Sequence, residues 1–108
     1  MSISKYIKFK KSVYAINDKY GIEPIHVKIL DHIANANYEN HPISVSDLIA
    51  IREIASPATI HMRLKQLVSL GMLEMKPCPD HRKKFLTVTN KTHERMNEIC
   101  ELINQQLD

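Results

Sequence analysis

Residues 56–71 combine an apolar stripe with side chains that can hydrogen-bond the edges of nucleic-acid bases. With about 100° per residue, Ile60, Leu64, Leu67 and Val68 share one side of a helix. Threonine, histidine and glutamine on the other side can bond base edges, and alanine or methionine can contact a thymine methyl group. We expect contacts with double-stranded DNA from Ser56, Ala58, Thr59, His61, Met62, Arg63, Lys65 and Gln66.

The alternative for this segment is a plain amphipathic surface helix. Arg63 lies at the flank of the polar side, where it can reach the DNA backbone or a neighbouring helix.

A second group of cationic side chains follows in a turn-rich segment with two prolines. The segment separates two short strand-like stretches, residues 72–76 and 85–89, so we expect a hairpin with a charged tip. Residues 44–84 carry seven Lys or Arg against four acids, the footprint expected of a phosphate-binding surface. The hairpin residues that we expect to contact DNA are His81, Arg82, Lys83 and Lys84.

Other chemistry is poorly represented. The six histidines and two cysteines do not show zinc-site spacing, and no phosphate-binding glycine loop, nucleophile elbow or H-E-x-x-H motif occurs. We therefore expect no metal, no cofactor and no enzymatic activity. Cys78 lies near basic residues that could activate a thiol, but a bystander role for Cys78 and for Cys100 is favoured.

The elements that would position these groups are mostly helical. Apolar residues at steps of three or four predict helices over residues 3–20, 24–37, 56–71 and 91–107, with a short helix starting at Ser44. A turn over residues 52–55 joins the short helix to the next one. Ser56-Pro57 is typical of a helix start, and Gly21 and Gly71 of helix ends.

In this order of elements, the chain resembles the MarR branch of winged helix-turn-helix regulators. The resemblance covers about residues 44–92 and rests on SVSDLIAIREIASPATIHMRLKQLVSLGMLEM followed by PDHRKKFLTVTNKT. It implies that residues 56–71 form the recognition helix and that the hairpin is the wing. It also implies that Arg82 enters or flanks the minor groove, braced by an ion pair with Asp80.

The 108 residues suit a single domain, 1–108, of the mostly helical α+β class. Residues 44–89 would be the DNA-binding core and wing. The apolar stripes of residues 1–20 and 91–108 could pack within one chain, but a core this small cannot easily cover both. We therefore expect dimerisation helices, with an interface formed by Tyr6, Phe9, Val13, Ile16, Met96, Ile99 and Ile103.

The resulting hypothesis is a cytoplasmic, nucleoid-associated homodimer that binds specific DNA sequences, as a repressor, with an unknown small-molecule effector as a possible further partner. No apolar run is long enough for a membrane span, and the N-terminus lacks the pattern of a signal peptide. The competing hypothesis is a winged-helix module that binds proteins and not DNA. The cationic residues of the recognition helix and hairpin favour DNA.

Overall fold

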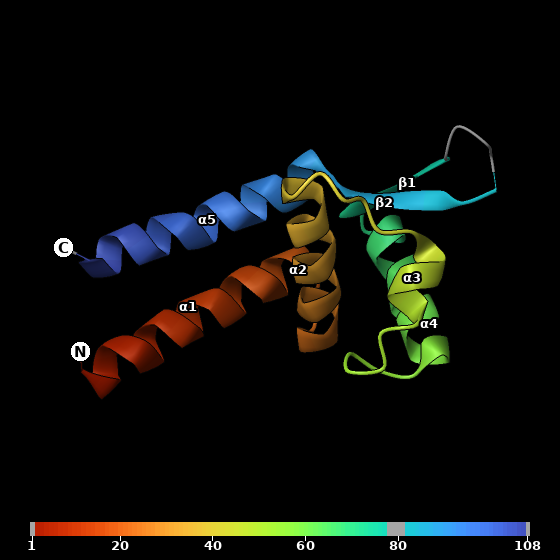
Figure 1. Ribbon diagram of the computed structural model, residues 1–108. Coiled ribbons are helices and arrows are strands. Elements are labelled where there is room, and N and C mark those ends of the chain that lie inside the picture. Colours follow the sequence, from red (N-terminus) through yellow and green to blue (C-terminus); the bar gives the residue numbers. More distant parts are fainter. Residues whose placement is uncertain (1, 78–81, 108) are drawn as a thin grey trace.

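The computed structural model describes residues 2–77 and 82–107. In this part of the chain, the elements follow the predicted order (Figure 1). They are α1 (Ile3–Tyr20), α2 (Pro24–Tyr38), α3 (Val45–Ile49), α4 (Pro57–Ser69), β1 (Leu73–Pro77), β2 (Lys84–Val88) and α5 (Asn90–Leu107).

The differences from prediction are small. Helix α3 ends at Ile49, so Ile51 lies in the turn that follows and not in the helix. Both strands are displaced by one residue from the predicted bounds: β1 starts and ends one residue later, and β2 one residue earlier.

The ends of α4 are set by local contacts. The Ser56 hydroxyl accepts a hydrogen bond from the Thr59 N–H at 3.3 Å, and Pro57 occupies the first helical position. After the helix, Gly71 has φ of +75°, a left-handed conformation that favours glycine. These signals confirm the predicted start and end of the helix.

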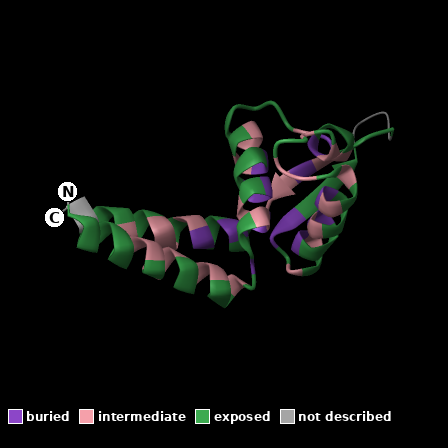
Figure 2. Ribbon diagram, turned by 90° about the horizontal axis from the view of Figure 1, so that it is seen from below, coloured by how far each residue is buried: buried purple, intermediate pink, exposed green. Residues whose placement is uncertain are grey.

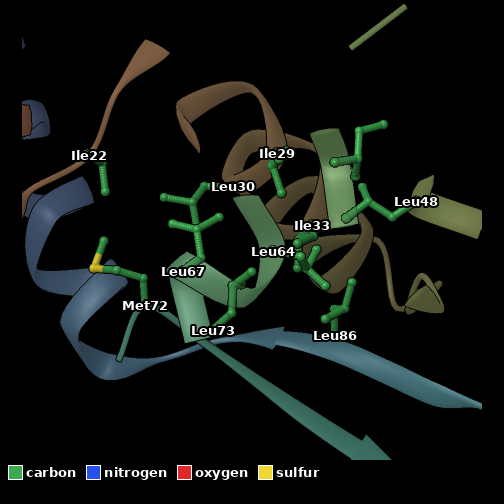
Figure 3. Close-up of a cluster of buried hydrophobic side chains, with 11 residues drawn as sticks. Ile22, Ile29, Leu30, Ile33, Leu48, Leu64, Leu67, Met72, Leu73 and Leu86 are labelled. Atoms are coloured by element: carbon green, nitrogen blue, oxygen red, sulfur yellow. The ribbon is translucent and has the colours of Figure 1, made fainter. Parts of the chain in front are cut away.

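The hydrophobic core lies between α2, α3, α4 and the hairpin (Figure 3). One stripe of each helix supplies it, because apolar residues three or four apart share a helix face. Its buried members are Ile22, Ile29, Leu30, Ile33, Leu48, Ile60, Leu64, Leu67, Met72, Leu73 and Leu86.

The hairpin is anchored to this core at one end. Strands β1 and β2 pair antiparallel, and each contributes one buried residue, Leu73 and Leu86. On the other edge of β2, the Leu86 N–H donates to the Ile43 carbonyl at 3.0 Å, and Ser44 forms an isolated bridge with Phe85. The segment before α3 therefore protects an edge that would otherwise be open.

Helices α1 and α5 lie side by side and extend away from the core as an arm, with the two termini at its far end (Figure 1). Residues of the arm are mainly exposed or half-buried, and α1 contains no buried residue (Figure 2). Three polar contacts join the described side chains of the two helices: Tyr20 and Lys19 both bond Glu98, and the Arg95 Nε donates to Asn17 at 2.9 Å.

Candidate nucleic-acid interface

Helix α4 places most of its predicted DNA-contacting residues on the surface. The buried stripe of Ile60, Leu64 and Leu67 holds the helix against the core, so the opposite side faces solvent. The predicted contact residues exposed there are Ser56, Ala58, His61, Met62, Lys65 and Gln66.

The first turn of α4 carries a pair of linked hydroxyl groups. The Ser56 Oγ donates to the Thr59 Oγ1 at 3.0 Å while accepting from the Thr59 N–H. Thr59 is half-buried, and its own O–H remains available to donate to another acceptor. The two residues predicted at the start of this surface thus form one hydrogen-bonded unit.

Arg63 and the carboxamide oxygen of Gln66 are linked to α2. Arg63 forms an ion pair with Glu23 at the start of α2, with 2.9 Å between Nη1 and Oε2. The same nitrogen donates to the Gln66 Oε1 at 3.1 Å, and His26 Nε2 lies 2.8 Å from that oxygen. Arg63 was predicted to reach either the DNA backbone or a neighbouring helix, and it contacts the neighbouring helix α2. The proposed DNA-contacting surface therefore does not include Arg63.

The described part of the hairpin tip is cationic. Arg82, Lys83 and Lys84 are all exposed. Arg82 and Lys83 precede β2 and Lys84 begins it, and β2 passes over one end of α3 and α4 (Figure 1). Asp80, His81 and Cys78 lie outside the described residues. The predicted support of Arg82 by Asp80 therefore stays a prediction.

The arm carries the residues predicted for a dimer interface. Phe9, Val13, Ile16, Met96 and Ile99 are half-buried in the single chain, where α1 and α5 lie together, whereas Tyr6 and Ile103 are 58% and 45% exposed. Three further large apolar residues of α1 that the predicted interface did not include are also exposed, namely Ile3, Ile7 and Tyr14.

Other kinds of site have little support in residues 2–77 and 82–107. Within these ranges, no three His, Cys, Asp or Glu side chains are grouped as metal ligands, and Cys100 is exposed on α5. No described helix is both long and apolar enough to cross a membrane.

No family model matches the sequence, and no curated protein is detectably similar to it. Solved structures do share its architecture. A transcriptional regulator from Thermotoga maritima has a TM-score of 0.72 at 22% identity, over 94% of this chain and 68% of the other. MepR from S. aureus, solved in complex with DNA, has a TM-score of 0.75 at 10% identity, with 95% and 82% covered. A mutant of MarR from E. coli has a TM-score of 0.64 at 19% identity, with 99% and 79% covered.

This chain has the winged-helix fold of the MarR proteins. The predicted fold class is thereby confirmed, including the helix-turn-helix formed by α3 and α4 and the hairpin in the place of the wing. The likeness extends over the arm as well, because more than nine-tenths of the chain superposes.

Within this MarR-type fold, sequence analysis missed the residue that connects α2 to the wing. The Asn37 Nδ2 donates to the Leu86 carbonyl, and its Oδ1 accepts from the Val88 N–H, both at 3.1 Å. A half-buried asparagine near the end of a helix carries no sequence signal for such a contact, because its partners are backbone groups of a distant strand.

Sequence analysis also missed the polar groups at the base of the arm. Arg95 is only 3% exposed, and Thr92 is fully buried, with its hydroxyl donating a hydrogen bond to the Met72 carbonyl at 2.5 Å. Buried polar groups of this kind need partners. Here the Met72 carbonyl holds the start of α5 on the core, and Asn17 holds Arg95 against α1.

Proposed function

We propose that this chain is a transcription regulator that binds double-stranded DNA at specific sequences and has no catalytic activity. The observation that carries the proposal is the outer face of α4, where Ala58, His61, Met62 and Lys65 are exposed while the opposite stripe is buried. A helix of this kind fits the major groove, where each base pair presents a distinct pattern of donors and acceptors.

The cationic hairpin supports the same proposal. Arg82, Lys83 and Lys84 are exposed, and guanidinium and ammonium groups bind phosphates or enter a narrow minor groove. The similarity to MepR, which was solved with DNA, agrees with this assignment of roles. A regulator of this type acts at the chromosome, so we propose a cytoplasmic, nucleoid-associated location.

We propose further that two copies assemble through the arm. Exposed apolar side chains on α1 and α5, among them Tyr6, Ile7 and Ile103, would leave water at such an interface. A two-fold dimer presents two recognition helices, so its target would be a near-palindrome with half-sites about 10 base pairs apart or a multiple of that. Binding over a promoter would repress it by occlusion, and a small molecule that alters the arm would be an effector.

The proposal is tested by selecting bound fragments from a random DNA library with the purified protein, followed by a salt titration on the enriched sequence. We expect a near-palindromic site and a linear fall of log affinity with log salt. Thr59→Ala and Lys65→Ala on α4 separate two kinds of contact. Loss of the Thr59 side chain is expected to cost about 1–3 kcal/mol of binding free energy on the enriched site and little on random DNA. Loss of the Lys65 side chain should weaken binding to both DNAs if it contacts phosphate.

Gln105→Ala, on the exposed end of α5, is the control variant and should bind both DNAs as the wild type does. Failure to enrich any sequence, together with binding that salt does not weaken, would instead favour the protein-binding winged-helix module.

A further inference from the structure

Gln66 is held by two hydrogen-bond donors that reach the same oxygen. His26 Nε2 lies 2.8 Å from the Gln66 Oε1, and Arg63 Nη1 lies 3.1 Å from it. A carboxamide oxygen has two lone pairs, so these two contacts use its full accepting capacity.

The chemistry of the partners fixes which end of the carboxamide they bind. An arginine guanidinium offers only donors. The His26 Nδ1 accepts a hydrogen bond from the Glu23 N–H at 2.9 Å, so the proton of the neutral ring is on Nε2 and is donated to Gln66. Both partners are therefore donors, and neither would bond the Nε2 of a reversed carboxamide.

The two partners are themselves held in place. His26, in the first turn of α2, is only 3% exposed. The ion pair with Glu23, at 2.9 Å, holds Arg63, whose side chain is 23% exposed. Rotation of the Gln66 carboxamide would break two hydrogen bonds in this network.

The other end of the carboxamide forms no hydrogen bond with the described residues. Gln66 is an exposed residue of α4, and its Nε2 has no partner in the part of the chain that the structure describes. Met62, Lys65 and Ser69 of the same helix are exposed beside it. Toward a DNA groove, this residue thus offers two N–H donors and no acceptor.

We propose that Gln66 is a specificity-determining residue that selects guanine over adenine at the base pair it faces. A glutamine that reads adenine uses both ends of its carboxamide, donating to N7 and accepting from the N6 amine. With Oε1 occupied, the second bond cannot form, and the amine of adenine would face another donor. Guanine presents two acceptors, O6 and N7, which match the available Nε2 group. This inference rests on the proposed function, because it assigns a base preference to the same surface of α4.

Random-library selection with the wild type and with Gln66→Ala locates the base pair whose preference Gln66 sets. We expect guanine there in the wild-type site. Replacing that guanine by 7-deazaguanine, which lacks N7, should weaken wild-type binding by about 5- to 160-fold, the range of one good base contact. The same replacement should have little further effect on Gln66→Ala.

Gln66→Glu gives a sharper test because it exchanges the outward donor for an acceptor. One carboxylate oxygen still accepts from His26 and Arg63, so the fold is expected to be retained. The other oxygen should change the preference from guanine to a base with an exocyclic amine, cytosine or adenine. Gln105→Glu on α5 adds the same charge far from α4 and should keep the wild-type preference.

Two results would overturn the inference. One is adenine at the located position, with affinity lost when either its N7 or its N6 amine is removed. The other is a base preference that stays unchanged in Gln66→Ala. If the wild type enriches no sequence, the proposed function itself fails and the inference falls with it. Nitrogen NMR of the DNA-free protein gives an independent check. We expect the His26 proton on Nε2, and a proton on Nδ1 would contradict the fixed carboxamide.

Discussion

The side-chain oxygen of Asn37 in α2 accepts a hydrogen bond from the backbone N–H of Val88 in β2, with 3.1 Å between Oδ1 and the nitrogen. Its Nδ2 donates to the Leu86 carbonyl at the same distance, so one side chain satisfies two backbone groups on the outer edge of β2. Ile43 satisfies a third, the Leu86 N–H. The contact fixes the wing to α2, and hence to the core on which α4 lies.

Removing this side chain should destabilise the fold. Asn37→Ala leaves the Val88 N–H and the Leu86 carbonyl without their partner, which is expected to cost about 1–3 kcal/mol of unfolding free energy. Chemical denaturation measures the loss. Asn35→Ala is the matched control, because it removes an exposed asparagine from the same helix. Both variants replace asparagine by alanine, so both gain the same helix propensity. Equal stabilities of the two variants would contradict a role of Asn37 in holding the wing.

A core substitution tests the buried stripe of α4. Leu64 is 2% exposed, so Leu64→Ala should lower the free energy of unfolding by about 2–5 kcal/mol through lost burial and a residual cavity. Met62, two residues away, is 49% exposed. Met62→Ala should change the stability by about 0.5 kcal/mol or less. The reverse order of effects, measured by denaturant unfolding, would mean that the outer face of α4 is not the one described.

Alkaline pH should weaken the contact between α1 and α5. The hydrogen bond from the Tyr20 hydroxyl to Glu98, with burial as the next cause, raises the pKa of Tyr20 from 10.0 to about 12. The folded state therefore holds this proton more tightly than the unfolded state. The resulting stability is complete below pH 10 and is lost as pH rises toward 12.

Tyr20→Phe isolates this effect from the other tyrosines. It should unfold more easily than the wild type at neutral pH, and the difference between them should shrink as pH rises from 10 to 12. Urea denaturation at several pH values measures this difference. A difference that stays constant over the range would show that Tyr20 contributes nothing through its proton.

The charges of the wing should act on every DNA sequence. If Arg82 and Lys84 neutralise phosphates, replacing either by alanine weakens binding generally and lowers the slope of log affinity against log salt by about one. If Arg82 occupies a narrow minor groove, its loss should also remove a preference for flanks rich in A·T pairs. Fluorescence anisotropy titrations over a range of salt measure both effects.

Asp80→Ala is the control for the wing. Removal of a carboxylate raises the positive charge, so a purely electrostatic wing would bind more tightly. We expect weaker specific binding, because the resemblance to MarR regulators implies that Asp80 orients Arg82 through an ion pair. Tighter binding would show that this role does not apply here.

Charged residues on the exposed apolar face of the arm should separate the proposed dimer. Tyr6→Glu and Ile103→Glu place a carboxylate where an apolar interface would exclude water. Sedimentation equilibrium should therefore show that the monomer–dimer equilibrium shifts toward the monomer. Met62→Glu is the matched control for sedimentation of the free protein, because Met62 is 49% exposed and belongs to α4, not to α1 or α5. A wild type that is monomeric at tens of micromolar, both free and on DNA, would contradict the dimer.

The sequence by itself determined the elements, their order and the two faces of α4. These depend on neighbours within one or two helical turns. The hydroxyl of Ser56 finds the N–H of Thr59 three residues on, and Gly71 adopts the left-handed conformation that ends the helix. A local signal is written in consecutive residues, so the periodicity of the stripe and the capping residues were enough to predict α4.

Only the tertiary structure decided what several polar residues do. His26 and Gln66 are 40 residues apart, Asn37 and Leu86 are 49 apart, and Arg95 and Asn17 are 78 apart. The helical wheel alone placed Gln66 with the outward residues, and it had no means of showing that the carboxamide oxygen is bound by α2. A directional hydrogen bond needs two groups within about 3 Å. That distance exists only after the chain has packed α2 against α4 and β2, and α1 against α5.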